Sequence, residues 1–195
     1  MIPVTPESHD LDEIYELNRL FLGFLRERAR QRVDCLDLAP PTARLLGSVG
    51  TPMLESAAQV PRALFRLRLE APTDWETGRG PRADAPERAA HALQLTLLHS
   101  TWNLSRRSGY KARLFLGVSL GQLRRLRVTP LSNLPAIAGR PGLVGCAFSG
   151  AQWLWRGLLT ETRPEHKRQL LLMVLQPQVT YAPIAGRPSR REAIS

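Results

Sequence analysis

The sequence contains few of the residues that build catalytic or metal centres. Its 195 residues include four scattered histidines and two cysteines, Cys35 and Cys146, with no Cys-x-x-Cys or His-x-x-x-His pair to act as a zinc template. No histidine stands beside a nucleophile motif or a carboxylate pair in a recognisable spacing. We therefore expect no enzyme, no metal and no cofactor. Two cysteines so far apart in sequence also provide no disulfide framework.

Long apolar runs are absent too. The longest, Leu170 to Leu175, is far shorter than the roughly 20 residues that cross a bilayer. The start of the chain, MIPVTPESHDLDE, has neither a basic n-region nor an apolar h-region of a signal peptide. These absences predict a cytoplasmic protein without a membrane partner.

Acidic residues are missing from one long segment, because none lies between Arg88 and Thr160. Residues 1–70 carry nine arginines against ten acids, a net charge of −1, while residues 71–195 carry 18 basic against seven acidic residues, a net charge of +11. The 25 arginines and two lysines are also compatible with coding bias or a solvated face. Bias alone does not remove acids from one half, so the asymmetry predicts a basic surface that attracts polyanions.

The spacing of apolar residues predicts a mainly α-helical fold. In the first half, helices are expected over residues 11–32, where Asp10 is a plausible N-cap, and over 40–47 and 51–60. Residues 63–69 then alternate apolar side chains with arginines, which indicates a half-buried strand. A lone strand needs a pairing partner, either elsewhere in the chain or in another chain.

Turn-forming residues dominate the stretch 71–86, which we interpret as a linker. It separates an interaction domain at 1–70 from a basic helical domain at 87–183, followed by a disordered tail at 184–195. The basic domain is expected to open with a helix that ends near Arg107. Later segments indicate a strand over 143–148, a short helix around Trp153, and a helix or a buried strand over 164–175, because periodicity does not distinguish the last two.

The segment KARLFLGVSLGQLRRL, Lys111 to Leu126, predicts two helices joined by a tight turn. Gly117 permits the bend, and Ser119 with Gln122 forms a capping box for a helix that begins at Leu120. We expect this helix to end at Thr129-Pro130. Its buried face is expected to consist of Leu120, Leu123 and Leu126.

The polar and basic side chains of this second helix are expected to face outward. In helix-turn-helix proteins, the side chains of the second helix contact bases or phosphates. A short capped turn inside an all-helical core is the alternative interpretation. The candidate contacts to double-stranded DNA are Arg106, Arg107, Lys111, Arg113, Gln122, Arg124, Arg125 and Arg127.

A second functional class is a protein-interaction adaptor that does not bind DNA. It would dock other proteins through the predicted strand and through an aromatic patch near Leu154. The residues expected at such a partner or dimer interface are Phe65, Leu67, Leu69, Trp153 and Trp155.

The two halves also show weak internal similarity. An ungapped alignment of the chain with itself at an offset of 80 residues pairs Leu17 with Leu97 and Arg44 with Arg124. Of the 55 pairs whose first member lies between Ile14 and Arg68, eight are identical. A repeated unit whose copies cover each other's apolar face lets one chain mimic a dimer. We therefore expect either a pseudo-dimer or an ordinary homodimer.

The first half resembles the bacterial flagellar transcriptional regulator subunit FlhD over about residues 11–70. The resemblance rests on Ile14-Tyr15-Glu16-Leu17-Asn18, on Leu36-Asp37-Leu38, and on the closing Leu64-Phe65-Arg66-Leu67-Arg68-Leu69. Together with the internal similarity, it implies two small FlhD-like helical units, each ending in a short strand, the second with a helix-turn-helix-like element. It also implies a dimer-forming activator of flagellar genes that acts with a zinc-containing FlhC-like subunit and RNA polymerase. The extra basic half implies more direct DNA contact than such a subunit normally makes.

Overall fold

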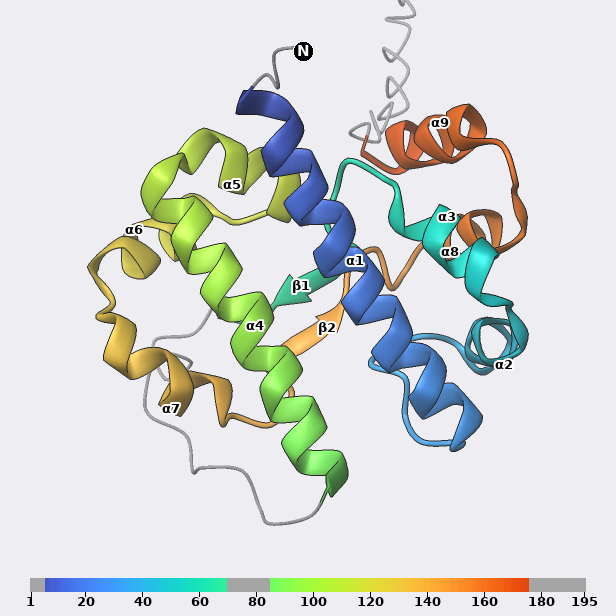
Figure 1. The fold of residues 1–195 in the computed structure, drawn as a ribbon, viewed down its shortest axis with the longest axis horizontal. Helices are drawn as coiled ribbons and strands as arrows, with labels where there is room; N and C mark the ends of the chain where they lie inside the picture. The colour runs from blue at the N-terminus through green and yellow to red at the C-terminus, as the bar shows by residue number, and fades with distance from the viewer. Residues whose placement is uncertain (1–5, 70–84, 176–195) are drawn as a thin grey trace, which may run out of the picture.

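The computed structural model describes residues 6–69 and 85–175, and within them the fold is mainly α-helical with one small sheet (Figure 1). This confirms the expected fold class at that level. Most of the predicted linker, 71–86, and all of the predicted tail, 184–195, lie outside the described residues.

The first half consists of α1 (Pro6–Arg30), α2 (Pro40–Ser48), α3 (Thr51–Ala58) and β1 (Phe65–Leu67). Proline lies in the first turn of both α2 and α3, where its missing N–H costs no intrahelical hydrogen bond. The buried face of α1 carries Ile14, Leu17, Phe21 and Leu25 at helical spacing. α1 therefore packs on α2 and α3 along the stripe that the sequence predicts.

The second half consists of α4 (Ala85–Arg107), α5 (Gly109–Leu116), α6 (Leu120–Val128), the 3₁₀ turn η2 (Leu131–Asn133), α7 (Leu134–Ala138), β2 (Val144–Cys146), α8 (Gln152–Thr160) and α9 (Pro164–Leu175). α9 settles the helix-or-strand alternative in favour of a helix. Its Leu170 lies against Gly157 of α8, where an added Cβ would meet the leucine side chain at 2.5 Å.

The two strands pair with each other, so β1 finds its partner within the chain. The pairing is antiparallel, with Phe65 opposite Cys146 and Leu67 opposite Val144. Phe65 and Leu69 are buried in the chain's own core and have no free surface to offer a second protein. Leu67 is partly buried.

α8 and α9 are the last helices of the second half in sequence but pack with the first half in space. α8 lies against α2 and α3, and α9 lies against α8 (Figure 1). Trp155 of α8 is 0% exposed, and its Nε1 donates a hydrogen bond to the carbonyl oxygen of Ala147 at 3.0 Å. Trp155 is therefore a core residue, whereas Trp153 remains exposed.

The bounds of several elements recur at a constant offset along the chain. At the offset of 80 residues that pairs Leu17 with Leu97, α2 (40–48) corresponds to α6 (120–128). At the same offset, α3 (51–58) corresponds to η2 and α7 together (131–138). β1 and β2 follow the same offset to within one position. α2 and α3 pack on α1 as α6 and α7 pack on α4. Among the described residues, no helix has both the length and the apolar content to cross a bilayer.

Candidate nucleic-acid interface

The turn between α5 and α6 depends on a glycine. Gly117 is the C-cap of α5 with φ of 69°, in the left-handed region that side chains with a Cβ rarely adopt. Its N–H donates to the carbonyl oxygen of Ala112. At the other end of α5, the Ser108 hydroxyl accepts from the backbone N–H of Lys111 at 3.3 Å. Both ends of this short helix are therefore capped by local groups.

α6 begins with the capping box that the sequence predicts. The Ser119 hydroxyl accepts from the Gln122 N–H at 3.2 Å, and the Gln122 side-chain oxygen accepts from the Ser119 N–H at 2.9 Å. Leu123 and Leu126 are buried as expected, but Leu120 is 52% exposed. The expectation for Leu120 is therefore wrong, because the side chain of this first helical residue is largely open to solvent.

Residues of the first half donate hydrogen bonds to the C-terminal end of α5, next to the turn. The sequence pattern does not predict these contacts. The Arg62 guanidinium donates to the carbonyl oxygens of Arg113 and Leu114, and the Ala63 N–H donates to the Phe115 carbonyl at 2.7 Å. Burial lowers the pKa of Arg62. These bonds satisfy carbonyl groups that the end of α5 leaves without intrahelical partners. No local pattern around Arg62 signals this long-range role.

The structure places Gln122 differently from its predicted role. Its side-chain nitrogen donates to the Leu67 carbonyl oxygen at 3.3 Å, while its oxygen completes the capping box. The side chain thus joins α6 to the end of β1 and does not project outward. Gln122 therefore links the two halves, and we no longer count it among the candidate DNA contacts.

Two predicted contacts form ion pairs with α1. Arg107 lies 3.3 Å from a carboxylate oxygen of Asp10 and 3.0 Å from one of Glu13, and the Lys111 Nζ lies 2.5 Å from Asp10. Carboxylates of the first half therefore offset two of the basic charges. The cluster fastens the end of α4 and the start of α5 to α1.

Two further arginines bridge α4 and α6. The Arg106 guanidinium stacks 4.8 Å from the Trp102 ring centre and donates to the Arg127 carbonyl at 3.3 Å. The Arg127 Nε donates to the Ser105 carbonyl at 3.0 Å. Each guanidinium is exposed and has more donors than these bonds use. Arg106 and Arg127 can therefore link α4 to α6 and still offer free N–H donors to an anion.

Arg113 and Arg124 remain exposed, and within the described part of the chain their side chains have no hydrogen-bond or ion-pair partner. Arg125 is half-buried and engaged. The same stretch also exposes large apolar side chains, namely Tyr110, Leu114, Leu120, Val128 and Leu131. The surface of α5, α6 and η2 is thus acid-free and combines cations with apolar groups.

α2, which corresponds to α6 in the self-alignment, has a different environment. Its N-cap, Ala39, has no side-chain cap, and the Gln152 oxygen of α8 accepts from the Ala39 N–H at 3.3 Å and from the Thr42 hydroxyl at 2.9 Å. The preceding turn has Asp37 at φ of 77°, ion-paired with Arg68. The N-terminus of α2 is therefore capped by a side chain from α8, whereas the N-terminus of α6 is capped by Ser119 and Gln122.

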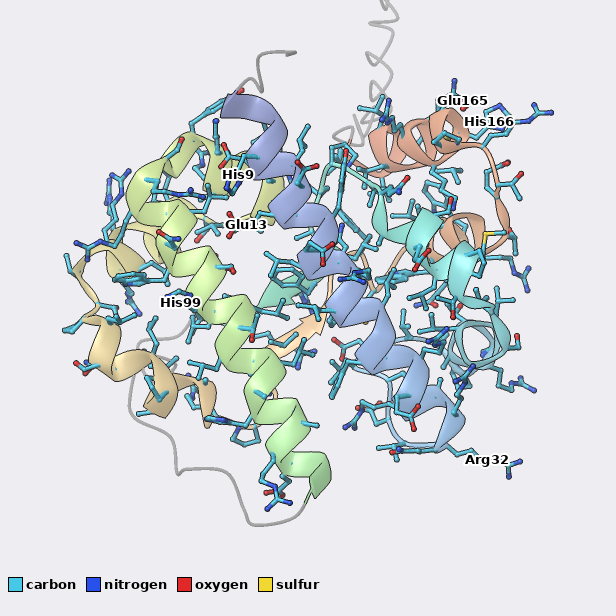
Figure 2. The ribbon with its side chains drawn as sticks, in the orientation of Figure 1. His9, Glu13, Arg32, His99, Glu165 and His166 are labelled. Carbon is cyan, nitrogen blue, oxygen red and sulfur yellow. The ribbon has the colours of Figure 1, made fainter. Side chains whose placement is uncertain are left out.

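Titratable side chains do not gather into a reactive cluster in the described ranges, where no group of three metal-ligating residues occurs. Figure 2 shows His9, His99 and His166 on three separate helices. Cys35 and Cys146 meet in the core, where the Cys146 thiol lies 3.7 Å from the Cys35 carbonyl oxygen. Burial raises the pKa of both thiols, which keeps them protonated and unreactive.

Comparison with protein-family models, with curated proteins and with solved structures gave no match to this chain.

Proposed function

We propose that the chain is a transcriptional regulator of the FlhD type that binds duplex DNA through α5, the Gly117 turn and α6. The observation that carries this proposal is that α6 supplies its own N-terminal cap, while α8 covers its counterpart α2. An exposed helix within a segment free of acidic residues suits insertion beside phosphates.

In this proposal the exposed Arg113 and Arg124 are the leading phosphate or base contacts, and Arg106, Arg125 and Arg127 are secondary contacts. Arg107 and Lys111 act through the α1 carboxylates as positioning residues that fix the orientation of α5.

The constant offset between corresponding element bounds supports the proposal of a duplicated unit. The antiparallel β1–β2 pair then joins the two units as a strand pair would join the subunits of a two-fold dimer. In this proposal the chain is a fused pseudo-dimer. An FlhC-like subunit and RNA polymerase are its partners by resemblance alone.

A non-DNA-binding adaptor is the second candidate. It is favoured by the exposed apolar side chains of Tyr110 and Val128, which a purely phosphate-binding surface does not need. The apolar surface of α5 and α6 then replaces the buried Phe65, Leu69 and Trp155 as the docking face.

A titration of the full chain against a fluorescent 24-base-pair duplex at four salt concentrations tests the proposal. We expect log K to fall linearly with log salt, with a slope of about −0.9 for each phosphate that is neutralised. Absence of binding at low salt would contradict DNA binding. Co-purification with a defined protein, together with that absence, would establish the adaptor.

A further inference from the structure

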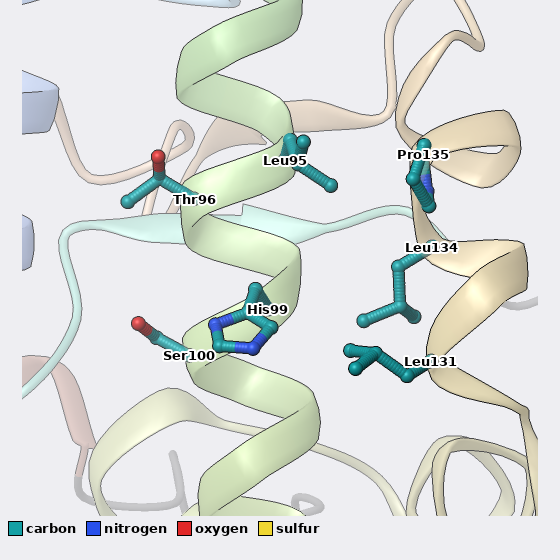
Figure 3. Close-up of a pocket in the computed structure, with 7 residues that line it drawn as sticks. All are labelled: Leu95, Thr96, His99, Ser100, Leu131, Leu134 and Pro135. Atoms are coloured by element: carbon teal, nitrogen blue, oxygen red, sulfur yellow. The ribbon is translucent and has the colours of Figure 1, made fainter.

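A shallow apolar groove lies between α4 and the η2–α7 segment. Figure 3 shows Leu95 and His99 on α4 facing Leu131, Leu134 and Pro135 across it. Its volume is about 390 Å³, which is within the range typical of ligand sites. Thr96 and Ser100 join His99 as the polar groups of its lining.

The first half has a groove at the equivalent place, between α1 and α3, with a volume of about 410 Å³. Corresponding residues of the self-alignment line both grooves, because Tyr15, Glu16, Arg19 and Glu55 stand where the second half has Leu95, Thr96, His99 and Pro135. The first groove is also lined by Asp12. The shape is kept, but one groove is acidic and the other is apolar.

The apolar groove is held open by bonds that span it. The His91 ring nitrogen lies 3.2 Å from the Pro135 carbonyl oxygen, and the Trp102 Nε1 donates to the Thr129 carbonyl at 2.9 Å. These bonds join α4 to Pro135 within the opposite segment and to Thr129 just before it. The groove is therefore formed before any ligand arrives, which lowers the entropic cost of docking.

The face of α4 that borders this groove has basic ends. The residues along it follow helical spacing of three or four positions, namely Arg88, His91, Leu95, His99, Trp102 and Arg106. The two arginines are exposed and stand about 27 Å apart along the axis, at about 1.5 Å per residue. No acidic residue occurs anywhere between them.

We propose that this groove binds an amphipathic helix of a partner protein whose polar face is acidic. Apolar side chains at three- and four-residue spacing fill the floor lined by Leu95, Leu131 and Leu134, as in other helix-in-groove complexes. Carboxylates at the helix ends meet Arg88 and Arg106. In the first-half groove Arg19 pairs with Glu16, and the carboxylates of Asp12 and Glu55 repel the same helix, so of these two grooves only the apolar one accepts it. This inference does not depend on DNA binding.

The test uses an 18-residue fluorescein-labelled peptide with leucines at i, i+3, i+4 and i+7 and glutamates elsewhere, and a twin with lysines in place of the glutamates. Fluorescence anisotropy is measured with the full chain. We expect the acidic peptide to bind with micromolar affinity and the lysine twin to bind at least tenfold more weakly. Equal binding of both peptides, or binding of neither, would overturn the proposal.

Matched variants locate the site. Leu131 is 53% exposed, so Leu131→Asp leaves the core intact and should weaken binding of the acidic peptide at least tenfold. Thr51→Asp, at the corresponding position of α3, should leave the affinity within twofold. His99→Glu, also at an exposed site, is the second groove variant and should weaken binding likewise. Circular dichroism checks folding, and equal effects of Leu131→Asp and Thr51→Asp would overturn the assignment.

Discussion

The helices α2 and α6 occupy corresponding places in the two halves and have opposite environments. The first begins without a cap of its own and depends on Gln152 of α8, whereas the second carries its own Ser119–Gln122 box. The turn before α2 uses Asp37 paired with Arg68, and the turn before α6 uses Gly117. Each helix buries two side chains, but α8 covers the N-terminal end of α2, whereas α6 exposes more of its residues.

Charge follows the same division. The groove of the first half is lined by Asp12, Glu16 and Glu55. At the start of α1, Asp10 and Glu13 pair with Arg107 and Lys111 across the boundary between the halves. The surface of α5, α6 and α7 has no carboxylate side chain. The first half therefore neutralises part of the basic charge and leaves the rest exposed on the second.

Removing the Trp155 side chain of α8 should cause the largest loss of stability. Trp155→Ala removes the fully buried indole of α8, the helix that packs on α2 and α3, and we expect a loss of about 3–5 kcal/mol in the free energy of unfolding. Trp153→Ala, at a site that is 46% exposed, should cost below about 1 kcal/mol. Urea denaturation measures both, and similar losses would mean that α8 does not belong to the first-half core.

Substitutions in the two turns should change stability by different amounts. Gly117→Ala puts a Cβ at φ of 69° and 3.0 Å from the Arg62 guanidinium, so we expect a loss of about 1–3 kcal/mol. Asp37→Gly relieves a similar backbone conformation but loses the exposed Arg68 ion pair, so its net effect should be close to zero. Thermal unfolding compares the variants, and a larger loss for Asp37→Gly would contradict the difference between the turns.

The caps should contribute equally and independently. Ser119→Ala and Gln152→Ala each remove the side-chain acceptor at one helix N-terminus, with an expected loss of about 1 kcal/mol each. The double variant should show the sum, because the two caps serve different helices. Non-additive losses in urea denaturation would show that α2 and α6 are coupled.

The smallest effect concerns Lys167, which is 1% exposed and donates to the Ser56 hydroxyl at 2.7 Å. Burial lowers its pKa, and Glu161 opposes this shift. The unfolded chain then binds more protons below pH 10.5, so this group's contribution to stability rises with pH through that window. Lys167→Met should be more stable by up to about 1 kcal/mol at pH 7.

The stability advantage of Lys167→Met should shrink as the pH approaches 10.5. Both proteins contain the same two buried thiols, so the contribution of the thiols cancels in this difference. A constant advantage between pH 7 and pH 10 would contradict the assignment.

Local chemistry made much of the fold predictable. The prolines at the start of α2 and α3, Gly117 and the capping box act within a few residues, and the structure places α2, α3 and α6 close to their expected bounds. The expected N-cap of the first helix is wrong, because α1 begins at Pro6 and Asp10 lies inside it, paired with Arg107 and Lys111. Periodicity does not predict α9, because its apolar run fits both a helix and a strand; in the structure it is a helix whose Leu170 packs against Gly157 of α8.

Long-range contacts were not predictable from local pattern. Gln152 caps α2 through Ala39, which lies 113 positions before it, and Gln122 reaches the Leu67 carbonyl across 55 positions. The same limit applies to the site, because spacing alone did not separate Arg107 and Lys111, which bind α1, from Arg113 and Arg124, which remain exposed.

The most direct measurement compares Arg124→Ala with Arg44→Ala, which lies at the corresponding position of α2, in duplex titrations over a range of salt concentrations. We predict that Arg124→Ala weakens binding and reduces the magnitude of the salt slope by about 0.9, since one phosphate contact is lost. Arg44→Ala should change neither. Equal effects of the two variants, or an effect of Arg44→Ala alone, would contradict the assignment of DNA contact to α6.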